Sequence, residues 1–191
     1  MDALLRPAAL RGAAEVLLRP CPVPAAAGIY AWYFPVVPRG VPTDGCHVVD
    51  GATLLYVGIS PSAPAANGKA PSKQTVRQRL RIHLRGNASS STLRLTLGCL
   101  LADELGTTLR LVGKGRLTFG AEGETRLNEW LVANARLAWA AVERPWEIEH
   151  QLIKTVVLPL NLDQNRHSPF HQTLSGLRAE QRARARALTL A

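Results

Sequence analysis

Three short runs of apolar and aromatic residues set the main limit on how this chain can fold. They cover residues 28–34, 53–59 and 137–142, and each has the length and composition of a β-strand. Around them, apolar residues recur at helical spacing, which predicts helices. The expected helices cover residues 1–20, 74–85, 91–105, 124–134, 145–157 and 173–190. This mixture of separate strands and helices predicts an α+β fold.

Size and composition exclude several classes of protein. The chain has 191 residues, 47% of them hydrophobic, which fits one domain with a buried core and short appendages. No apolar run approaches the roughly 18 residues of a membrane-spanning helix. We therefore expect no membrane attachment, and the arginine-containing N-terminus lacks the pattern of a signal peptide. Three separated cysteines without a C-x-x-C pair argue against a disulfide scaffold and favour a reducing, cytoplasmic setting.

Positive charge is concentrated in one stretch of the chain. The formal net charge is +9, and between Gly51 and Ala102 there is no Asp or Glu. Seven cations lie in this basic segment: Lys69, Lys73, Arg77, Arg79, Arg81, Arg85 and Arg94. Such a segment would attract a polyanion, and nucleic acid is the expected one. The alternative interpretation is a solvated basic surface without a partner.

The helix expected at 74–85 carries two polar residues on its apolar side. At about 100° per residue, Arg79 and His83 fall beside or within the stripe formed by Leu80 and its apolar neighbours. The other arginines of this helix drift toward solvent: Arg77, Arg81 and Arg85. His83 alone could be a satisfied core residue, but a buried guanidinium beside it requires an anionic partner.

The helix expected at 145–157 has a carboxylate on its apolar face. Glu149 falls near Leu152 and Ile153, whereas Glu147 points out to solvent. A lone carboxylate in that position costs several kcal/mol unless a cation meets it. Two interpretations are open, an ion pair with a core arginine or a metal ligand at the floor of a basic cleft. A carboxylate ligand suits Mg²⁺ or Mn²⁺.

Five short motifs follow one another along the chain on these predicted elements. They are Gly28-Ile29-Tyr30, Tyr56-Val57-Gly58, Arg79-x-x-x-His83, Glu149-x-x-Leu152-Ile153 and Pro159-x-Asn161. Either three-letter motif alone is weak, but all five in this order are specific. Together they resemble the GIY-YIG nuclease family over about residues 28–161.

This resemblance implies a small three-stranded antiparallel sheet flanked by helices, with N- and C-terminal helical extensions added in this chain. It also implies cleavage of phosphodiester bonds with one divalent metal, Mg²⁺ or Mn²⁺. Carried over position by position, the catalytic residues are Tyr30, Tyr56, Arg79, His83, Glu149 and Asn161.

Each of these residues receives a role from the resemblance. Glu149 would hold the metal, and Arg79 would neutralise charge on the phosphoryl oxygens. Tyr30 and Tyr56 would face the scissile phosphate, and we expect the two positions to meet across an antiparallel hairpin. We expect Tyr30 to be the general base and Tyr56 to position the phosphate or the water. His83 would support proton transfer, and Asn161 would hold the site together.

The chain departs from the family pattern in the spacing of its tyrosines. Tyr30 and Tyr56 are 26 positions apart, more than in the short hairpin usual in the family. The extra residues predict insertions at about 35–52 and 60–73, which resemble those of restriction-type members. The expected domain division is an N-terminal helical extension at 1–24, a nuclease-like domain at 25–161 and a basic C-terminal extension at 162–191.

Two classes of function are open at this point. The first is a metal-dependent DNA endonuclease, either of restriction type or a repair enzyme specific for single strands or branched structures. The second is a DNA-binding module that keeps the fold and cuts nothing. A pure binding module would not need Glu149 on an apolar face, and this favours the enzyme. We expect the protein to be a monomer or a homodimer. The backbone of the DNA would then be bound by Lys69, Lys73, Arg77, Arg81, Arg85 and Arg94.

Overall fold

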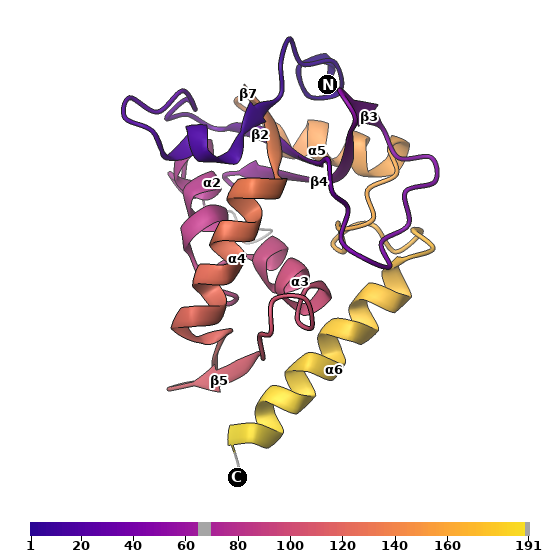
Figure 1. Ribbon diagram of the computed structural model, residues 1–191. Helices are drawn as coiled ribbons and strands as arrows, with labels where there is room; N and C mark the ends of the chain where they lie inside the picture. The colour runs from indigo at the N-terminus through magenta and orange to yellow at the C-terminus, as the bar shows by residue number, and fades with distance from the viewer. Residues whose placement is uncertain (65–69, 190–191) are drawn as a thin grey trace.

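An antiparallel sheet of five strands forms the centre of the protein, in the order β1-β7-β2-β4-β3 (Figure 1). The structure is a computed structural model, and it describes residues 1–64 and 70–189. The strands are β1 (Arg11–Gly12), β2 (Gly28–Phe34), β3 (Val48–Val49), β4 (Ala52–Ser60) and β7 (Arg136–Ala141). The α+β class is confirmed, and so are the three long strands expected from the sequence.

The expectation of three strands was wrong, because β1 and β3 extend the sheet at its two edges. Each of these strands has two residues, which is too short for an alternating pattern to be visible in a sequence. A separate hairpin, β5 (Arg110–Val112) with β6 (Arg116–Thr118), forms a second sheet.

Helices cover both faces of the sheet, which explains why all seven residues of β2 are buried. They are α1 (Asp2–Leu5), α2 (Val76–Arg85), α3 (Thr92–Leu100), α4 (Gly120–Asn134), α5 (Pro145–Thr155) and α6 (His171–Thr189). Tyr30, Trp32 and Phe34 share a core with α2, α3, α4 and α6. The alternate residues of β2 share the opposite core with α1 and α5. No helix in the described ranges combines the length and apolarity that crossing a bilayer requires.

The expected N-terminal helix over 1–20 was wrong. Helix α1 stops at Leu5, and the chain continues through β1 and a 3₁₀ helix, η1 (Ala13–Leu17). Pro7 lacks an amide donor and disfavours a helical conformation in the residue before it, so a continuous helix cannot form here. The apolar residues of this segment divide between the two cores, with Leu4 in one and Val16 in the other.

The C-terminal helix was predicted at 173–190, and its existence is confirmed by α6. Figure 1 shows α6 running diagonally away from the sheet, past α3 and toward β5. It contacts both of these elements, and Leu174 and Ala185 are fully buried there. This helix is therefore packed onto the domain along its length.

Candidate active site

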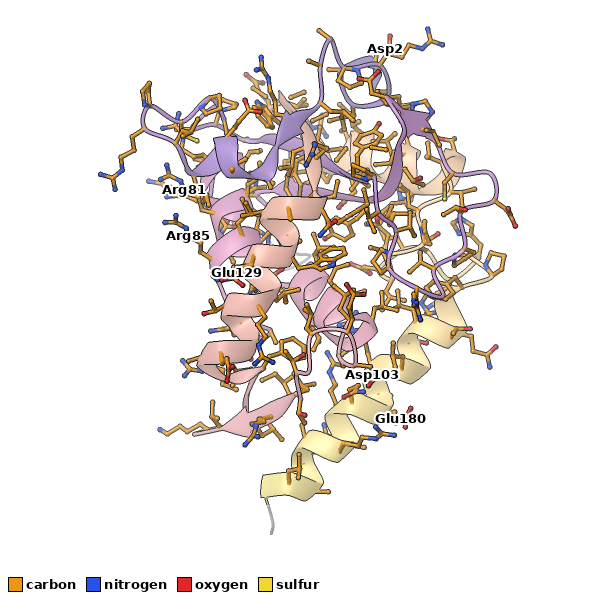
Figure 2. The ribbon with its side chains drawn as sticks, in the orientation of Figure 1. Asp2, Arg81, Arg85, Asp103, Glu129 and Glu180 are labelled. Carbon is orange, nitrogen blue, oxygen red and sulfur yellow. The ribbon has the colours of Figure 1, made fainter. Side chains whose placement is uncertain are left out.

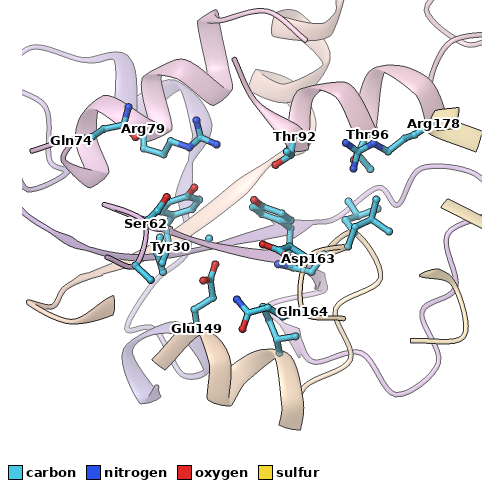
Figure 3. A pocket seen from close by; sticks show the side chains of 18 residues that line it. Tyr30, Ser62, Gln74, Arg79, Thr92, Thr96, Glu149, Asp163, Gln164 and Arg178 are labelled. Atoms are coloured by element: carbon cyan, nitrogen blue, oxygen red, sulfur yellow. The ribbon is translucent and has the colours of Figure 1, made fainter. Parts of the chain in front are cut away.

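A pocket of about 680 Å³ lies where β2 and β4 meet helices α2, α3, α5 and α6 (Figure 3). Every catalytic candidate except His83 lines it, and His83 lies directly behind Tyr30. The further lining side chains that carry polar groups are Ser62, Gln74, Thr92, Thr96, Asp163, Gln164 and Arg178. The pocket therefore collects residues from segments that are far apart in the sequence.

The register of β2 and β4 places the tyrosines on one face. Tyr30 pairs with Gly58, and Tyr56 pairs with Trp32. Residues two apart on a strand face the same way, so the tyrosines are diagonal neighbours on the pocket side. The expectation that the two tyrosine positions meet directly was wrong by two residues, because Tyr30 lies opposite Gly58 and not opposite Tyr56.

The two motif glycines allow this close packing. A Cβ on Gly58 would lie 2.6 Å from the Tyr30 hydroxyl, so the phenol ring crosses β4 where a side chain is missing. A Cβ on Gly28 would lie 2.2 Å from the carbonyl oxygen of Ala140 on β7. Gly58 therefore lets Tyr30 reach the pocket, and Gly28 lets β2 and β7 approach each other closely.

His83 connects Tyr30 to the start of α3. Its Nε2 lies 2.7 Å from the Tyr30 hydroxyl, and its Nδ1 lies 2.6 Å from Oγ of Ser91. Burial, reinforced by the positive charges of Arg79 and Arg94, lowers the pKa of His83 well below its ordinary value. A neutral imidazole has one N–H, so His83 donates in one of these two hydrogen bonds, to Tyr30 or to Ser91, and accepts in the other.

Burial raises the pKa of both tyrosines. The pKa of Tyr30 is well above its ordinary value because of burial and then the neighbouring Tyr56, with Arg79 opposing the shift. The pKa of Tyr56 is also raised by burial, against hydrogen bonding with Thr92 and the charge of Arg79. Both phenols are therefore protonated at neutral pH.

Arg79 approaches the pocket from α2, whose first turn is held by Thr75 and Gln78 in a capping box. The guanidinium is half-buried, and its Nη1 donates to the carbonyl oxygen of Ser90 at 2.9 Å. Figure 3 shows the remainder of the guanidinium directed into the pocket above Tyr30. Its other N–H groups can therefore bind an anion there.

Glu149 approaches from the opposite side, on α5 (Figure 3). Its carboxylate is half-buried, and among the described residues no Lys, Arg or His forms a salt bridge with it. Burial, followed by the negative charge of Asp163, raises the pKa of Glu149 to about 7. The carboxylate therefore faces the pocket without a salt bridge to any described residue, and it could hold a metal ion there.

Asn161 closes the outer edge of β4. Its Oδ1 accepts from the amide of Val57 and its Nδ2 donates to the carbonyl oxygen of Val57, both at 2.9 Å. The amide of Leu160 donates to the carbonyl oxygen of Leu55 in the same way. This segment replaces a partner strand beside Tyr56 and fixes the pocket edge from which Asp163 and Gln164 extend.

With this geometry in place, the comparison with protein families is decisive. The family described as GIY-YIG catalytic domain matches residues 28–180 of the chain. The chain belongs to the GIY-YIG family. This match starts at β2 and ends within α6, and it supports a nuclease-type function. Neither the curated proteins nor the solved structures include a significant match to the chain.

One expected DNA contact of this GIY-YIG domain is contradicted by the structure. The side chain of Arg94 is fully buried and forms a salt bridge with Glu124 at 2.5 Å. It also donates to Asn128 and to the backbone carbonyl of His83. Arg94 is therefore part of the interior that supports His83. Its acidic partner lies outside the segment 51–102, so a local count of charges could not reveal it.

The other expected contacts are distributed around α2. Arg77 is half-buried and donates to the carbonyl oxygen of Val23 at 2.7 Å. Arg81 lies about 200° around the helix from Arg79, away from the pocket, and Figure 2 shows it on the outer side with Arg85. Lys73 is exposed, and Lys69 lies outside the described residues.

Sequence reasoning missed Arg178, which enters the pocket from α6. On a helical projection Arg178 lies within about 40° of Leu174 and Ala185, which are both fully buried. The same argument that singled out Arg79 and Glu149 would therefore have found it. Asp163 and Thr96 also line the pocket, and they carry no motif that would identify them.

Proposed function

We propose that this protein is a divalent-metal-dependent endonuclease that hydrolyses phosphodiester bonds in DNA. The observation that supports this most directly is the position of Glu149. It is a half-buried carboxylate that forms no salt bridge with any described residue, in a pocket that also holds Tyr30, Tyr56 and Arg79. A module that only binds DNA would gain nothing from a carboxylate placed where a phosphate must lie.

The proton chemistry follows from the Tyr30–His83 pair. A phenol with a raised pKa cannot act as a preformed phenolate, but it can pass a proton on. As a water oxygen bonds to phosphorus, the bond to the leaving oxygen breaks and this oxygen departs with the electron pair as an alkoxide, which takes a proton from solvent. In the same step Tyr30 accepts the proton of the attacking water. At the same time Tyr30 transfers its own proton to Nε2 of His83. In this relay Nδ1 of His83 donates to Ser91, so the imidazole begins neutral and ends as an imidazolium.

Arg79 and Tyr56 act on the phosphate itself. The N–H groups of Arg79 that do not donate to Ser90 bind the phosphoryl oxygens and stabilise the charge that develops on them in the transition state. The hydroxyl of Tyr56 positions the phosphate or the water. It is less buried than Tyr30 and lies next to Thr92, which orients it.

The residues present fit a divalent cation at Glu149. In the described part of the chain no group of three or more His, Cys, Asp or Glu side chains forms a metal cluster. Mg²⁺ commonly takes one or two carboxylates and completes its shell with water and phosphate oxygens, which suits Glu149 in an open pocket. When bound, the ion would supply Lewis-acid polarisation of the phosphate and neutralise the leaving oxygen.

The test is incubation of the purified protein with supercoiled, linear and single-stranded DNA in Mg²⁺, Mn²⁺ or EDTA. We expect cleavage that requires the metal and is abolished by Glu149→Gln, with DNA binding largely retained. The matched control is Glu147→Gln on the same helix, whose carboxylate is exposed and pairs with Arg144. Equal cleavage by the Glu149→Gln variant and the wild type would refute the assignment. The preferred DNA form would separate restriction-type from single-strand or structure-specific cutting.

We also propose that the protein works in the cytoplasm. All three cysteines are free thiols, and Cys99 is buried. Free thiols are the usual state in a reducing compartment.

A further inference from the structure

A buried arginine at the α6 side of the pocket forms no salt bridge within the described part of the chain. The side chain of Arg178 lines the pocket, and the residue is only 9% exposed. Its Nε is buried and has no hydrogen-bond partner among the residues that the structure describes. Within residues 1–64 and 70–189 no carboxylate forms a salt bridge with Arg178. The acidic residue of α6, Glu180, pairs with Arg184 instead.

The groups that surround Arg178 favour binding of an anion. Burial lowers the pKa of Arg178, and the positive charge of Arg182, one turn further along α6, lowers it further. Thr92 and Thr96 from α3 bring hydroxyl groups to the same wall of the pocket. A buried guanidinium without a counter-charge is unfavourable. The fold therefore holds a binding group for which the described residues supply no anionic partner.

The position of Arg178 in the pocket indicates what that partner is. Figure 3 shows Arg79 and Arg178 at opposite ends of one wall, with Thr92 and Thr96 between them and Glu149 on the facing side. Arg79 lies above Tyr30, where the reaction takes place. Arg178 lies at the other end of this wall, beside Thr96, so it suits an anion displaced from the reacting centre along the strand.

We infer that Arg178, with the hydroxyls of Thr92 and Thr96, forms a second phosphate subsite. It binds a non-scissile phosphodiester of the same nucleic-acid strand, beside the one that is cut. This inference rests on the proposed function, because its ligand is the strand held in the nuclease pocket. It makes α6 a part of the active site, since this helix supplies the side chain that sets where the strand lies.

The experiment measures binding rather than cleavage, so it does not depend on turnover. Oligonucleotides carrying one neutral methylphosphonate at successive positions are titrated against the Glu149→Gln protein and against the same protein with Arg178→Gln. We expect one methylphosphonate position next to the scissile phosphate to weaken binding about 10-fold or more. Arg178→Gln should weaken binding of the all-phosphate strand by a similar factor, with a smaller salt dependence. In that variant the methylphosphonate should have no further effect.

The matched control is Arg186→Gln, an exposed arginine on the same helix. It should leave the methylphosphonate profile unchanged. If Arg178→Gln impairs folding, the scan on the Arg178 protein still tests the subsite, because a profile in which only the scissile position matters would overturn the inference. Additive effects of the methylphosphonate and of Arg178→Gln would overturn it too. Coupled effects in the Glu149→Gln protein, together with no cleavage by the wild-type protein in Mg²⁺ or Mn²⁺, would instead support the subsite and refute the proposed nuclease.

Discussion

The hydroxyl of Tyr30 lies 2.7 Å from Nε2 of His83, and this contact joins β2 to α2. It gives the Tyr30 phenol a proton acceptor that is neutral at physiological pH, since burial holds the pKa of His83 well below its ordinary value. Tyr56 has no such contact with a ring nitrogen among the described residues, although its ring lies 6.2 Å from that of His83. The two tyrosines are therefore not equivalent, and their removal should have different effects.

We expect Tyr30→Phe to lower the single-turnover cleavage rate by on the order of 10²–10⁴-fold, because it removes the proton relay. Tyr56→Phe should have a smaller effect and should leave the pH–rate profile in place. Both variants keep the aromatic ring, so each serves as the packing control for the other. Near-normal cleavage by Tyr30→Phe together with an inactive Tyr56→Phe would reverse the two roles.

The acidic limb of the pH–rate profile should report on Glu149. Its pKa of about 7 means that the carboxyl is increasingly protonated below that pH and loses affinity for a cation. Cleavage at sub-saturating metal should therefore rise as the pH increases through about 7. Asp163 contributes to this raised pKa by its negative charge, so Asp163→Asn should lower the pKa and move the acidic limb to lower pH.

This shift can be measured from cleavage rates and from Mn²⁺ affinity across the same pH range. Glu147→Gln removes an exposed carboxylate from the same helix and should leave both curves in place. An acidic limb that stays fixed in Asp163→Asn would show that another group controls it.

The extent to which the sequence predicts this fold depends on the element. The long strands and the helices α2, α4, α5 and α6 have enough residues for their periodicity to be recognised, whereas β1 and β3 have two residues each. The register of β2 and β4 was not predictable, because the connection between them is long and a bulge follows Trp32.

The same distinction applies to the site. Glu149 and Arg79 are detectable because a charged residue interrupts an apolar helical stripe. Arg94 was misplaced because its partner, Glu124, comes from a different helix, and pairing between helices cannot be seen in a local pattern. Arg178 interrupts the stripe of α6 in the same detectable way, but no motif drew attention to it.

The contact between Gly58 and Tyr30 gives a prediction about stability. A methyl group on Gly58 would lie 2.6 Å from the Tyr30 hydroxyl, in a region where Tyr30 is only 1% exposed. We expect Gly58→Ala to destabilise the protein by about 1–3 kcal/mol through overpacking and to displace Tyr30 from His83. Gly176→Ala on α6 meets no atom within 4 Å and should instead be neutral or stabilising. Urea unfolding compares the two variants, and wild-type stability in Gly58→Ala would contradict the packing argument.

Arg94 should matter for stability and not for direct contact with DNA. Its buried guanidinium pairs with Glu124 and donates to the carbonyl oxygen of His83, so Arg94→Met leaves a buried carboxylate without its cation. We expect a loss of about 3–5 kcal/mol in the free energy of unfolding, measured by urea denaturation. Arg85→Met removes an exposed arginine from α2, and its effect on stability should be within about 0.5 kcal/mol. Under conditions where both variants remain folded, Arg94→Met should retain the wild-type dependence of DNA affinity on salt, because no phosphate contact is removed. A flattened salt dependence in folded Arg94→Met, with normal stability, would return Arg94 to the nucleic-acid surface.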